Sequence, residues 1–457
     1  MASESFDVVI VGAGTGGLNV GALLASAGKK ILVLEKQDRV GGRTFSVKHK
    51  NTFIENGIHG LILSGHQDEV YRRVGKTLPQ NVNTWKSSQI YLDGEWQNFE
   101  SLLADSTEEL EKLLKDAVFD RSYEQIQKLN DISVEKFISD RTNDEGVLVW
   151  FRYMGWIYGG TRFPPTDFSA GALFCTFKRR ADAHGGKLTD LGYMVEGGCG
   201  GILPPLVETI VENGGEVRTN SRVSKVVIEN GWARGVEVES QERVIPTQVV
   251  DTEFIEAPVV VSAVPLWDVL NVVSEDDLPP WYAERIRFFS RKTLNVWTLN
   301  YVLDNKPSID ESDLMCVTAG PISGRPWIAG CLPFADTEGQ YSVICWMNTG
   351  WHQPPSVFHT AKASVKVQVR QLFDAWEADV RELFPELEAD CLWKVRSFGP
   401  ASIVETPGNV GKHLISMVPE GVEGLYLVGE KTQEAEIMGI YGSAQVALKC
   451  ADRILKQ

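Results

Sequence analysis

Glycines near the start of the chain are spaced for binding phosphate. Gly12, Gly14 and Gly17 follow an apolar run at residues 6–11, and a helical pattern continues from them to residue 27. Such glycines permit a tight turn, let the backbone approach a pyrophosphate, and let the helix pack closely on the strand. The N-terminus of the helix then offers free N–H groups and a positive dipole end to the phosphates. The spacing therefore predicts a dinucleotide-binding turn.

An acidic residue after the next strand indicates which nucleotide is bound. Residues 31–34 form a second apolar run, and Glu35 follows it directly. A carboxylate at this position accepts hydrogen bonds from both ribose hydroxyls, which argues against a 2′-phosphate and so against NADP.

A glycine pair and an arginine extend this region. Gly42 belongs to the pair, where backbone amides can come close to a ligand, and Arg43 can hold a diphosphate by a charge-assisted pair. A glycine turn followed by a solvated arginine is the alternative for the same residues.

The C-terminal region has the pattern of a flavin-binding half-site. A predicted strand at residues 424–428 leads to Glu430, which can bind a ribityl chain. Gly439 and Ile440 open a last helix, whose N-terminus can stabilise negative charge on the N1/O2 side of a reduced flavin. A nicotinamide enzyme has no need of this distant half-site, so the two motifs together predict FAD. Because no His or Cys stands at an obvious flavin-linking position in the tail motif, non-covalent FAD is expected.

These motifs resemble the FAD-dependent phytoene desaturase and amine oxidase superfamily. The resemblance rests on residues 11–43, 195–198 with the helix that follows, 214–226, 259–265 and 424–447. It covers the FAD-binding parts well and the rest poorly, and the tail is closer to the carotenoid desaturase and isomerase branch than to amine oxidases. The resemblance implies that Val223 holds adenine through backbone groups. It also implies that the glycines at 197–201 form a close turn beneath the flavin, which we favour over a second phosphate loop.

The tail departs from that branch in two ways. The turn at residues 432–436 is more acidic and one residue shorter than usual, and Glu430 replaces a shorter aspartate. Tyr441 falls near the place from which an amine oxidase contributes one ring of its aromatic sandwich, but out of register. The flavin contacts should survive both departures.

The length and the alternation of patterns predict an α/β fold class. A chain of 457 residues is too long for one core. We expect a discontinuous Rossmann-type FAD-binding domain, interleaved with an α+β substrate-binding domain. The FAD-binding domain is expected at residues 1–66, 186–265 and 405–457, and the substrate domain, with a helical cap in its first part, at 67–185 and 266–404.

Composition excludes several classes of partner. The net charge of −16 argues against nucleic acid and against electrostatic attraction to anionic lipid. The seven cysteines have no CxxC spacing, which predicts free thiols in a reducing, cytoplasmic location and no metal site. The sequence has no apolar window of about 18 residues, so no transmembrane helix is expected. Peripheral contact with a membrane stays open.

Few side chains need to be catalytic, because a flavin supplies the redox chemistry. His59 lies in the segment that in the family passes near the flavin, where it either acts as a base or makes a structural hydrogen bond. Glu434 and Glu436 are alternative acid/base groups, unless their turn is simply solvated. Arg152 either binds a substrate carboxylate or holds a salt bridge, and Tyr441 is the aromatic candidate. Several of the thirteen tryptophans fall in the substrate segments, where they line an apolar tunnel or pack the core, including Trp156, Trp327, Trp346 and Trp351.

Three functions follow from these observations. The leading one is an FAD-dependent desaturase or dehydrogenase that passes a hydride from a C–H bond of a largely apolar substrate to flavin N5, with a quinone or another electron acceptor. The second is an amine oxidase that produces hydrogen peroxide. The third is a non-enzymatic lipid-handling or escort protein, like the Rab GDP-dissociation inhibitors, which share the fold. A protein without FAD has no physical reason to keep both half-sites, and this argues against the third.

Overall fold

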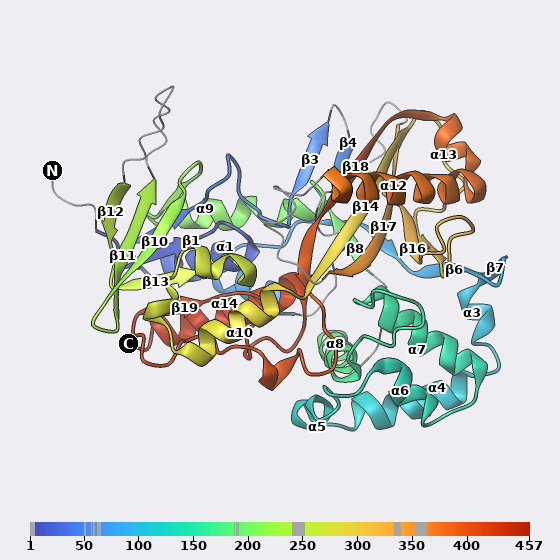
Figure 1. The fold of residues 1–457 in the computed structure, drawn as a ribbon, viewed down its shortest axis with the longest axis horizontal. Coiled ribbons are helices and arrows are strands. Elements are labelled where there is room, and N and C mark those ends of the chain that lie inside the picture. The colour runs from blue at the N-terminus through green and yellow to red at the C-terminus, as the bar shows by residue number, and fades with distance from the viewer. Residues whose placement is uncertain are drawn as a thin grey trace.

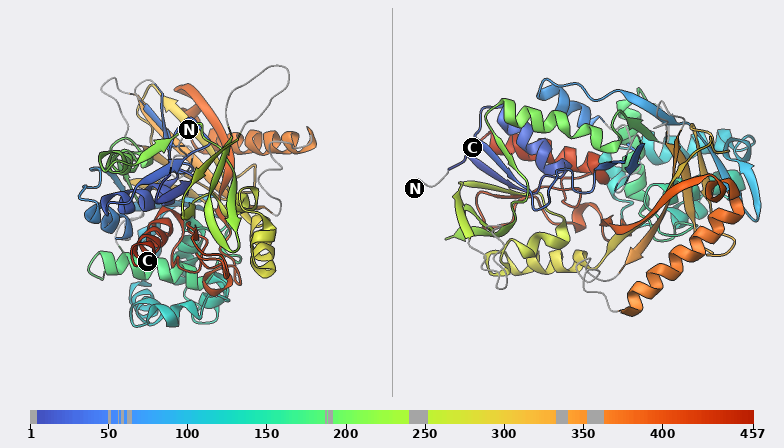
Figure 2. Two further views of the ribbon diagram at one scale, coloured as in Figure 1. Left: turned by 90° about the vertical axis from the view of Figure 1, so that its left-hand side faces the viewer. Right: turned by 90° about the horizontal axis from the view of Figure 1, so that it is seen from above.

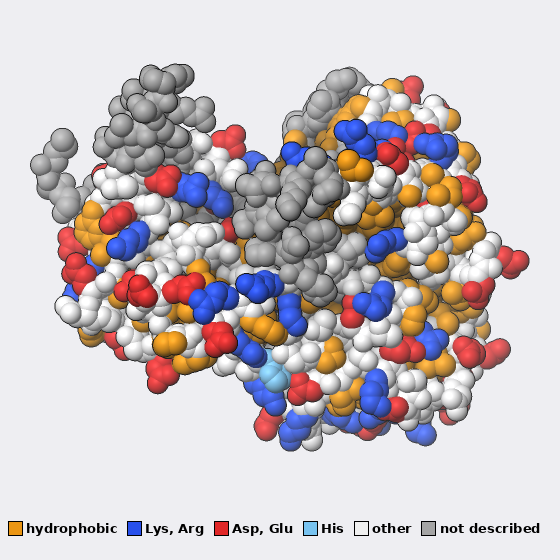
Figure 3. Space-filling view, in the orientation of Figure 1, with side chains coloured by type: hydrophobic (Ala, Val, Ile, Leu, Met, Phe, Trp, Pro, Cys, Tyr) orange, Lys and Arg blue, Asp and Glu red, His pale blue; other side chains and the backbone are white. Residues whose placement is uncertain are grey.

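Two lobes lie side by side in the molecule, as the ribbon and the space-filling view in the same orientation show (Figures 1 and 3). The computed structural model describes residues 5–49, 52–55, 57, 60–61, 65–186, 188, 192–239, 252–332, 340–351 and 363–457. The N-terminal strand and the C-terminal helix lie in the same lobe, whereas the other lobe combines a large sheet with a group of helices (Figures 1 and 2).

The first lobe is built on a five-stranded parallel sheet. Its order is β19 (Leu425–Leu427), β13 (Val259–Ser262), β1 (Val8–Val11), β2 (Ile31–Leu34) and β9 (Glu216–Arg218). All pairings are parallel, and β1 and β2 are buried at every position, as expected when both faces of a sheet are covered. The sheet therefore takes strands from three separated parts of the chain.

Different layers cover the two faces of this sheet. On one face, α1 (Thr15–Ser26) packs between α9 (Pro204–Glu212) and α14 (Gly439–Ile454). On the other lies an antiparallel sheet of β10 (Val223–Glu229), β11 (Trp232–Glu239) and β12 (Thr252–Glu256), together with α10 (Pro280–Ser290). Alternate residues of β1 enter the two cores, because successive side chains of a strand point to opposite faces. The predicted α/β fold class is confirmed, and the domain boundaries stay a prediction.

A seven-stranded mixed sheet forms the upper part of the second lobe in Figure 1. Its order is β18 (Cys391–Ile403), β14 (Thr293–Leu303), β17 (Tyr341–Trp351), β16 (Trp327–Leu332), β15 (Asp313–Val317), β6 (Ser87–Leu92) and β7 (Glu95–Asn98). The long helix α12 (Ala363–Leu383) packs on one face, where Trp327 and Trp376 are fully buried. Trp156 is buried in the core as well, and Trp346 is half-buried. The side chain of Trp351 lies outside the described residues.

Short helices form the lower part of this lobe. They are α3 (Phe99–Leu102), α4 (Thr107–Leu114), α5 (Tyr123–Gln127), α6 (Val134–Ser139), α7 (Glu145–Ile157) and α8 (Ala170–Ala183). Ser133, Asp144 and Ser169 cap α6, α7 and α8 by accepting backbone N–H bonds, which fixes where these helices begin. The rings of Phe151 on α7 and Phe174 on α8 pack edge to face with their centres 5.9 Å apart, and both belong to the core between these helices.

Smaller elements join these parts. They are β3 (Ser46–His49), β4 (Thr52–Glu55), α2 (His66–Arg73), β5 (Asn81–Trp85), β8 (Gly192–Val195), α13 (Pro385–Ala389), the π-helical turn η1 (Lys115–Phe119), and the 3₁₀ turns η2 (Cys199–Ile202), η3 (Leu266–Asn271), η4 (Glu275–Asp277) and η5 (Gly411–His413). β3 pairs with β4, and β5 pairs with β8. No helix in the described part of the chain is long and apolar enough to span a membrane.

Candidate cofactor-binding site

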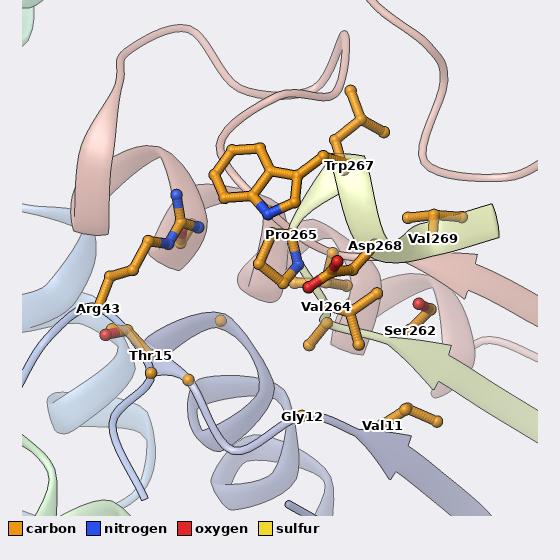
Figure 4. A pocket seen from close by; sticks show the side chains of 18 of the residues that line it. Val11, Gly12, Thr15, Arg43, Ser262, Val264, Pro265, Trp267, Asp268 and Val269 are labelled. Atoms are coloured by element: carbon orange, nitrogen blue, oxygen red, sulfur yellow. The ribbon is translucent and has the colours of Figure 1, made fainter. Parts of the chain in front are cut away.

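A cavity of about 600 Å³ lies where the strands of the parallel sheet end. Residues that follow β1, β2, β13 and β19 line it, together with the start of α14. Ligands of open parallel sheets bind outside the carboxyl ends of the strands, so this is the expected place for a nucleotide. Figure 4 shows its central part, with Thr15 below the Arg43 side chain and with Val264 and Pro265 on the loop that follows β13.

The three motif glycines do different things. Gly12 has φ +102° and lies against Ala263, where a Cβ would come 3.2 Å from the carbonyl oxygen. Gly14 lines the pocket as the N-cap of α1, in an extended conformation. Gly17 faces away from the pocket and lets α1 pack on β1, since a Cβ there would lie 2.1 Å from the Gly12 oxygen. The turn therefore combines close packing with an open side toward the pocket.

Buried hydroxyls in the pocket point to a polar ligand. The side-chain oxygens of Thr15, Ser262 and Thr432 are buried, and none has a hydrogen-bond partner among the described residues. All three residues line the pocket. Buried polar atoms almost always have a partner, so these positions fit the phosphates and hydroxyls of a dinucleotide. Sequence reasoning missed Ser262 and Thr432, although the end of a parallel strand was a usable signal for Ser262.

Glu35 closes one end of the pocket. Its side chain is 7% exposed and accepts hydrogen bonds from the backbone N–H groups of Ala13 and Gln37, each at 2.9 Å. Each carboxylate oxygen can accept more than one hydrogen bond, so capacity remains for ribose hydroxyls. Val223, the buried first residue of β10, lines the same end of the pocket, where the resemblance expects adenine.

Arg43 reaches across the pocket. Its guanidinium donates to the carbonyl oxygen of Ala401, lies 3.4 Å from Glu430 Oε1, and stands 5.2 Å from the ring centre of Trp267. Gly42 also lines the pocket, next to Gly14. The diphosphate-binding role of Arg43 stays a prediction, and its place in the pocket is compatible with it.

Glu430 closes the other end and is enclosed by positive groups. Its carboxylate accepts hydrogen bonds from Ser402 Oγ at 2.7 Å and from the Gly439 backbone N–H. Burial alone would raise the pKa of this carboxyl, but the charges of Lys431 and Arg43 and these hydrogen bonds outweigh burial and hold the pKa below its ordinary value. Glu430 is therefore a buried anion.

The start of α14 completes this end of the pocket. Gly439 and Ile440 are its first two residues, and both line the cavity. Lys431 lines it as well and pairs with Glu405 at 2.6 Å, with both side chains nearly buried. No spacing in the sequence identified Lys431 or Glu405.

Two of the predicted catalytic residues, Arg152 and Glu436, make ion pairs away from this pocket. Arg152 makes two hydrogen bonds to Glu135, at 2.9 and 2.7 Å, which is the salt bridge considered as its alternative. Glu436 accepts hydrogen bonds from Arg179, so its carboxylate is engaged in an ion pair. Arg152, Glu436 and Tyr441 are not among the described residues that line this pocket.

The remaining catalytic candidates are Tyr441 and His59. Tyr441 is buried and makes a hydrogen bond to Tyr193. Burial raises the pKa of Tyr193 to about 12, and the hydrogen bond from Tyr441 partly opposes that rise. His59 lies outside the described residues. The catalytic roles of His59, Tyr441, Glu436 and Arg152 therefore stay predictions.

The turn at residues 197–201 encloses another buried acid, which sequence reasoning missed. Glu55 is completely buried and accepts hydrogen bonds from Ser46 Oγ at 2.8 Å and from the Cys199 N–H at 3.0 Å. Burial raises its pKa to about 7, against the lowering effect of those hydrogen bonds. A Cβ on Gly198 would lie 2.3 Å from this carboxylate. Gly198 therefore makes room for Glu55, and none of the glycines at 197–201 lines the described pocket.

The described residues contain no group of three or more His, Cys, Asp and Glu side chains that could hold a metal ion. All seven cysteines are free, as predicted, and six of them are buried.

Comparisons with known proteins agree with this geometry. The family described as flavin-containing amine oxidoreductases matches residues 16–455. The chain is 25% identical over 500 residues to a 15-cis-phytoene desaturase of Capsicum annuum, which covers 99% of this chain and 78% of the relative. A 4,4'-diapophytoene desaturase of a Methylomonas species is 25% identical over 263 residues, or 51% of this chain and 50% of the relative. Flavin-containing amine oxidase A of Equus caballus is 51% identical over 73 residues, or 16% of this chain and 14% of the relative.

Solved structures share the fold. An oxidoreductase from Methanosarcina mazei has a TM-score of 0.67 at 18% identity, covering 97% of this chain and 99% of its own. Putrescine oxidase bound to putrescine has a TM-score of 0.64 at 16% identity, covering 99% of each chain. The predicted family resemblance and FAD as the cofactor are confirmed by these matches, and non-covalent attachment stays a prediction.

Proposed function

Since the chain belongs to the flavin-containing amine oxidoreductase family and is an FAD-dependent oxidoreductase, we propose that it removes a hydride from a C–H bond of a largely apolar substrate. Bound FAD would supply the hydride acceptor, its N5 atom. The residues of this chain would bind the cofactor, orient it and keep water from the reacting atoms.

One observation supports this proposal most: Glu35 and Glu430 line the same pocket. The first stands after β2 and the second after β19, so the two half-sites recognised in the sequence meet in space. Glu35 would hold the adenosine ribose, and the group of Glu430 and Gly439 would hold the ribityl chain and the flavin end. Arg43 lies beside Glu430 in the pocket and would hold the diphosphate.

The extent of the sequence matches favours a desaturase or dehydrogenase over an amine oxidase. The phytoene desaturase of Capsicum annuum aligns with 99% of this chain, including its substrate segments, whereas the named amine oxidase aligns with 16%. Phytoene and diapophytoene are apolar polyenes, so these names support an apolar substrate for this chain. We further propose a quinone or a similar compound as the electron acceptor, with peripheral membrane contact where such apolar partners are held.

A reducing, cytoplasmic location belongs to the same proposal. Its support is the set of seven free cysteines, because free thiols persist in reducing compartments. Fractionation of the native cells tests the location directly.

The substrate class can be tested with purified protein. We expect a yellow protein whose flavin is released by acid precipitation. Under anaerobic conditions, an apolar alkene or a cyclic carbonyl compound should bleach the flavin absorbance, whereas benzylamine, putrescine and tryptamine should yield little hydrogen peroxide in air. Rapid peroxide formation with an amine would replace the proposal by an amine oxidase. Colourless protein that takes up no FAD would favour an escort protein.

A further inference from the structure

The 3₁₀ turn η3 contacts the opposite wall of the cofactor pocket at two places. Trp267 stands 5.2 Å from the Arg43 guanidinium, and Asp268 Oδ2 lies 3.5 Å from Lys36 Nζ. All four residues line the pocket. Lys36 directly follows Glu35, whereas Arg43 neighbours Glu430, so the two contacts are placed toward the two ends of the site.

The turn is anchored from below. Leu266 and Val269 are buried in the core beneath the antiparallel sheet, 9% and 2% exposed. Trp267 and Asp268 lie between them in sequence and are half-buried on the pocket side. Figure 4 shows the Trp267 ring facing the end of the Arg43 side chain across the pocket. A turn that is fixed in the core and presents two side chains to the opposite wall is suited to hold a ligand in the pocket.

The chemistry of the two contacts differs. An arginine over an indole face is attracted by the ring quadrupole, and salt screens that interaction little when the groups are partly desolvated. The Lys36 side chain is 53% exposed and that of Asp268 is 25% exposed, so their pair is weaker and sensitive to salt. The contact through Trp267 should therefore be the stronger of the two.

We propose that Trp267, assisted by Asp268, retains FAD by closing the pocket over it. Both contacts must part before the cofactor can leave, so they act mainly on the rate of release. Trp267 also keeps the Arg43 guanidinium directed into the pocket, where a diphosphate would meet it. The proposal depends on FAD binding alone and not on which substrate the protein oxidises.

The experiment measures FAD release from the holoprotein. Release is followed by the rise of flavin fluorescence after dilution into an excess of FAD-free scavenger protein. Trp267→Leu should raise the dissociation rate constant about five- to tenfold, and Asp268→Asn about twofold. Trp281→Leu is the matched control, because Trp281 lies on the surface of α10, is 50% exposed and does not line the pocket.

Folding is checked separately by the unfolding midpoint of each variant without FAD. Trp267→Phe keeps an aromatic face and should release FAD more slowly than Trp267→Leu. If the leucine variant does not fold, Trp267→Phe and Asp268→Asn serve as the test instead. The proposal would then be overturned if both variants release FAD at the rate of the Trp281→Leu control. Equal release rates in wild type, Trp267→Leu and Trp281→Leu would overturn it as well.

Discussion

Two buried glutamates in this protein show opposite electrostatic behaviour. Glu430, at the end of the cofactor pocket, has a pKa below its ordinary value despite burial, because Lys431 and Arg43 carry positive charge beside it. Glu55, under the turn at residues 197–201, has hydrogen bonds from the Ser46 hydroxyl and from the backbone N–H and thiol of Cys199, and burial still raises its pKa to about 7. Burial alone therefore does not fix the state of a carboxyl group. Neighbouring cations keep one of them an anion that is ready to bind a ligand.

The largest effect is expected from removing the anion at the pocket end. Glu430→Ala deletes two hydrogen bonds to a charged acceptor and leaves Arg43 without its carboxylate, so FAD affinity should fall roughly a hundredfold, or by about 3 kcal/mol. Titration of the apoprotein with FAD measures this. An affinity within threefold of wild type would show that Glu430 is no part of the cofactor site.

Glu55 should reveal itself through pH. Its pKa in the folded protein, about 7, is above the ordinary value of 4.5, so the folded state binds this proton more tightly than the unfolded chain does. The stability that it contributes is fully present below about pH 4.5 and is lost as the pH rises through 7. Glu55→Gln should remove this loss, changing the difference in unfolding free energy between pH 5 and pH 8 by on the order of 2 kcal/mol.

Denaturant titrations of wild type and Glu55→Gln at both pH values give that comparison. The same titrations on Glu430→Gln are the matched control, since the lowered pKa of Glu430 places its own transition at lower pH. Parallel pH profiles for wild type and Glu55→Gln would mean that Glu55 titrates outside this range.

Removing Glu35 should have an intermediate effect. The hydrogen bonds described for its carboxylate come from the backbone N–H groups of Ala13 and Gln37, and no ion pair is described for it. Glu35→Ala removes the acceptor for the ribose, and FAD affinity should fall at least about tenfold, since hydrogen bonds to a charged group are worth roughly 1.5–3 kcal/mol each. The fold should survive. FAD content measured after dialysis checks this, and unchanged content would contradict the placing of the ribose beside Glu35.

The smallest effect is expected where no charge is involved. A Cβ on Gly14 would meet nothing within 4 Å, and the backbone there, with φ −74°, suits alanine. Gly14→Ala should therefore leave the stability of the apoprotein unchanged but fill space in the pocket, lowering FAD affinity about three- to fivefold at a cost of about 1 kcal/mol. Gly399→Ala, equally uncrowded but outside the pocket, is the control and should change neither quantity.

The first half-site was predictable because a continuous stretch of chain forms it. The helix expected to end before Gly28 is α1, which ends at Ser26, and Gly28 has φ +84°. Local patterns determine such a unit, since strand, turn, helix and strand are neighbours in sequence as well as in space. The last helix was predictable for the same reason, and it begins at Gly439 as expected.

The partners within the site were not predictable in this way. Ser402 approaches Glu430 from a distant part of the chain, and nothing in its own neighbourhood marks it. Arg43 was expected in the pocket from its glycine pair, but its contact with Glu430 was not. Glu436 was singled out from its acidic turn, whereas its partner, Arg179, lies on α8 of the other lobe and could not be identified from that turn. Side-chain pairing across a fold depends on topology, which single-residue patterns do not contain.

The parallel sheet that sets β19 beside β13 has a consequence for how the protein is made. Residues from Val11 to Ser443 line the pocket, so the cofactor cannot find a complete site on a growing chain. At about 5–20 residues per second, the first half-site waits roughly 20–80 s on the ribosome for the second. A product of premature termination could fold its first βαβ unit and still hold no flavin. Yellow colour in a preparation therefore reports chains that were translated at least as far as the start of α14.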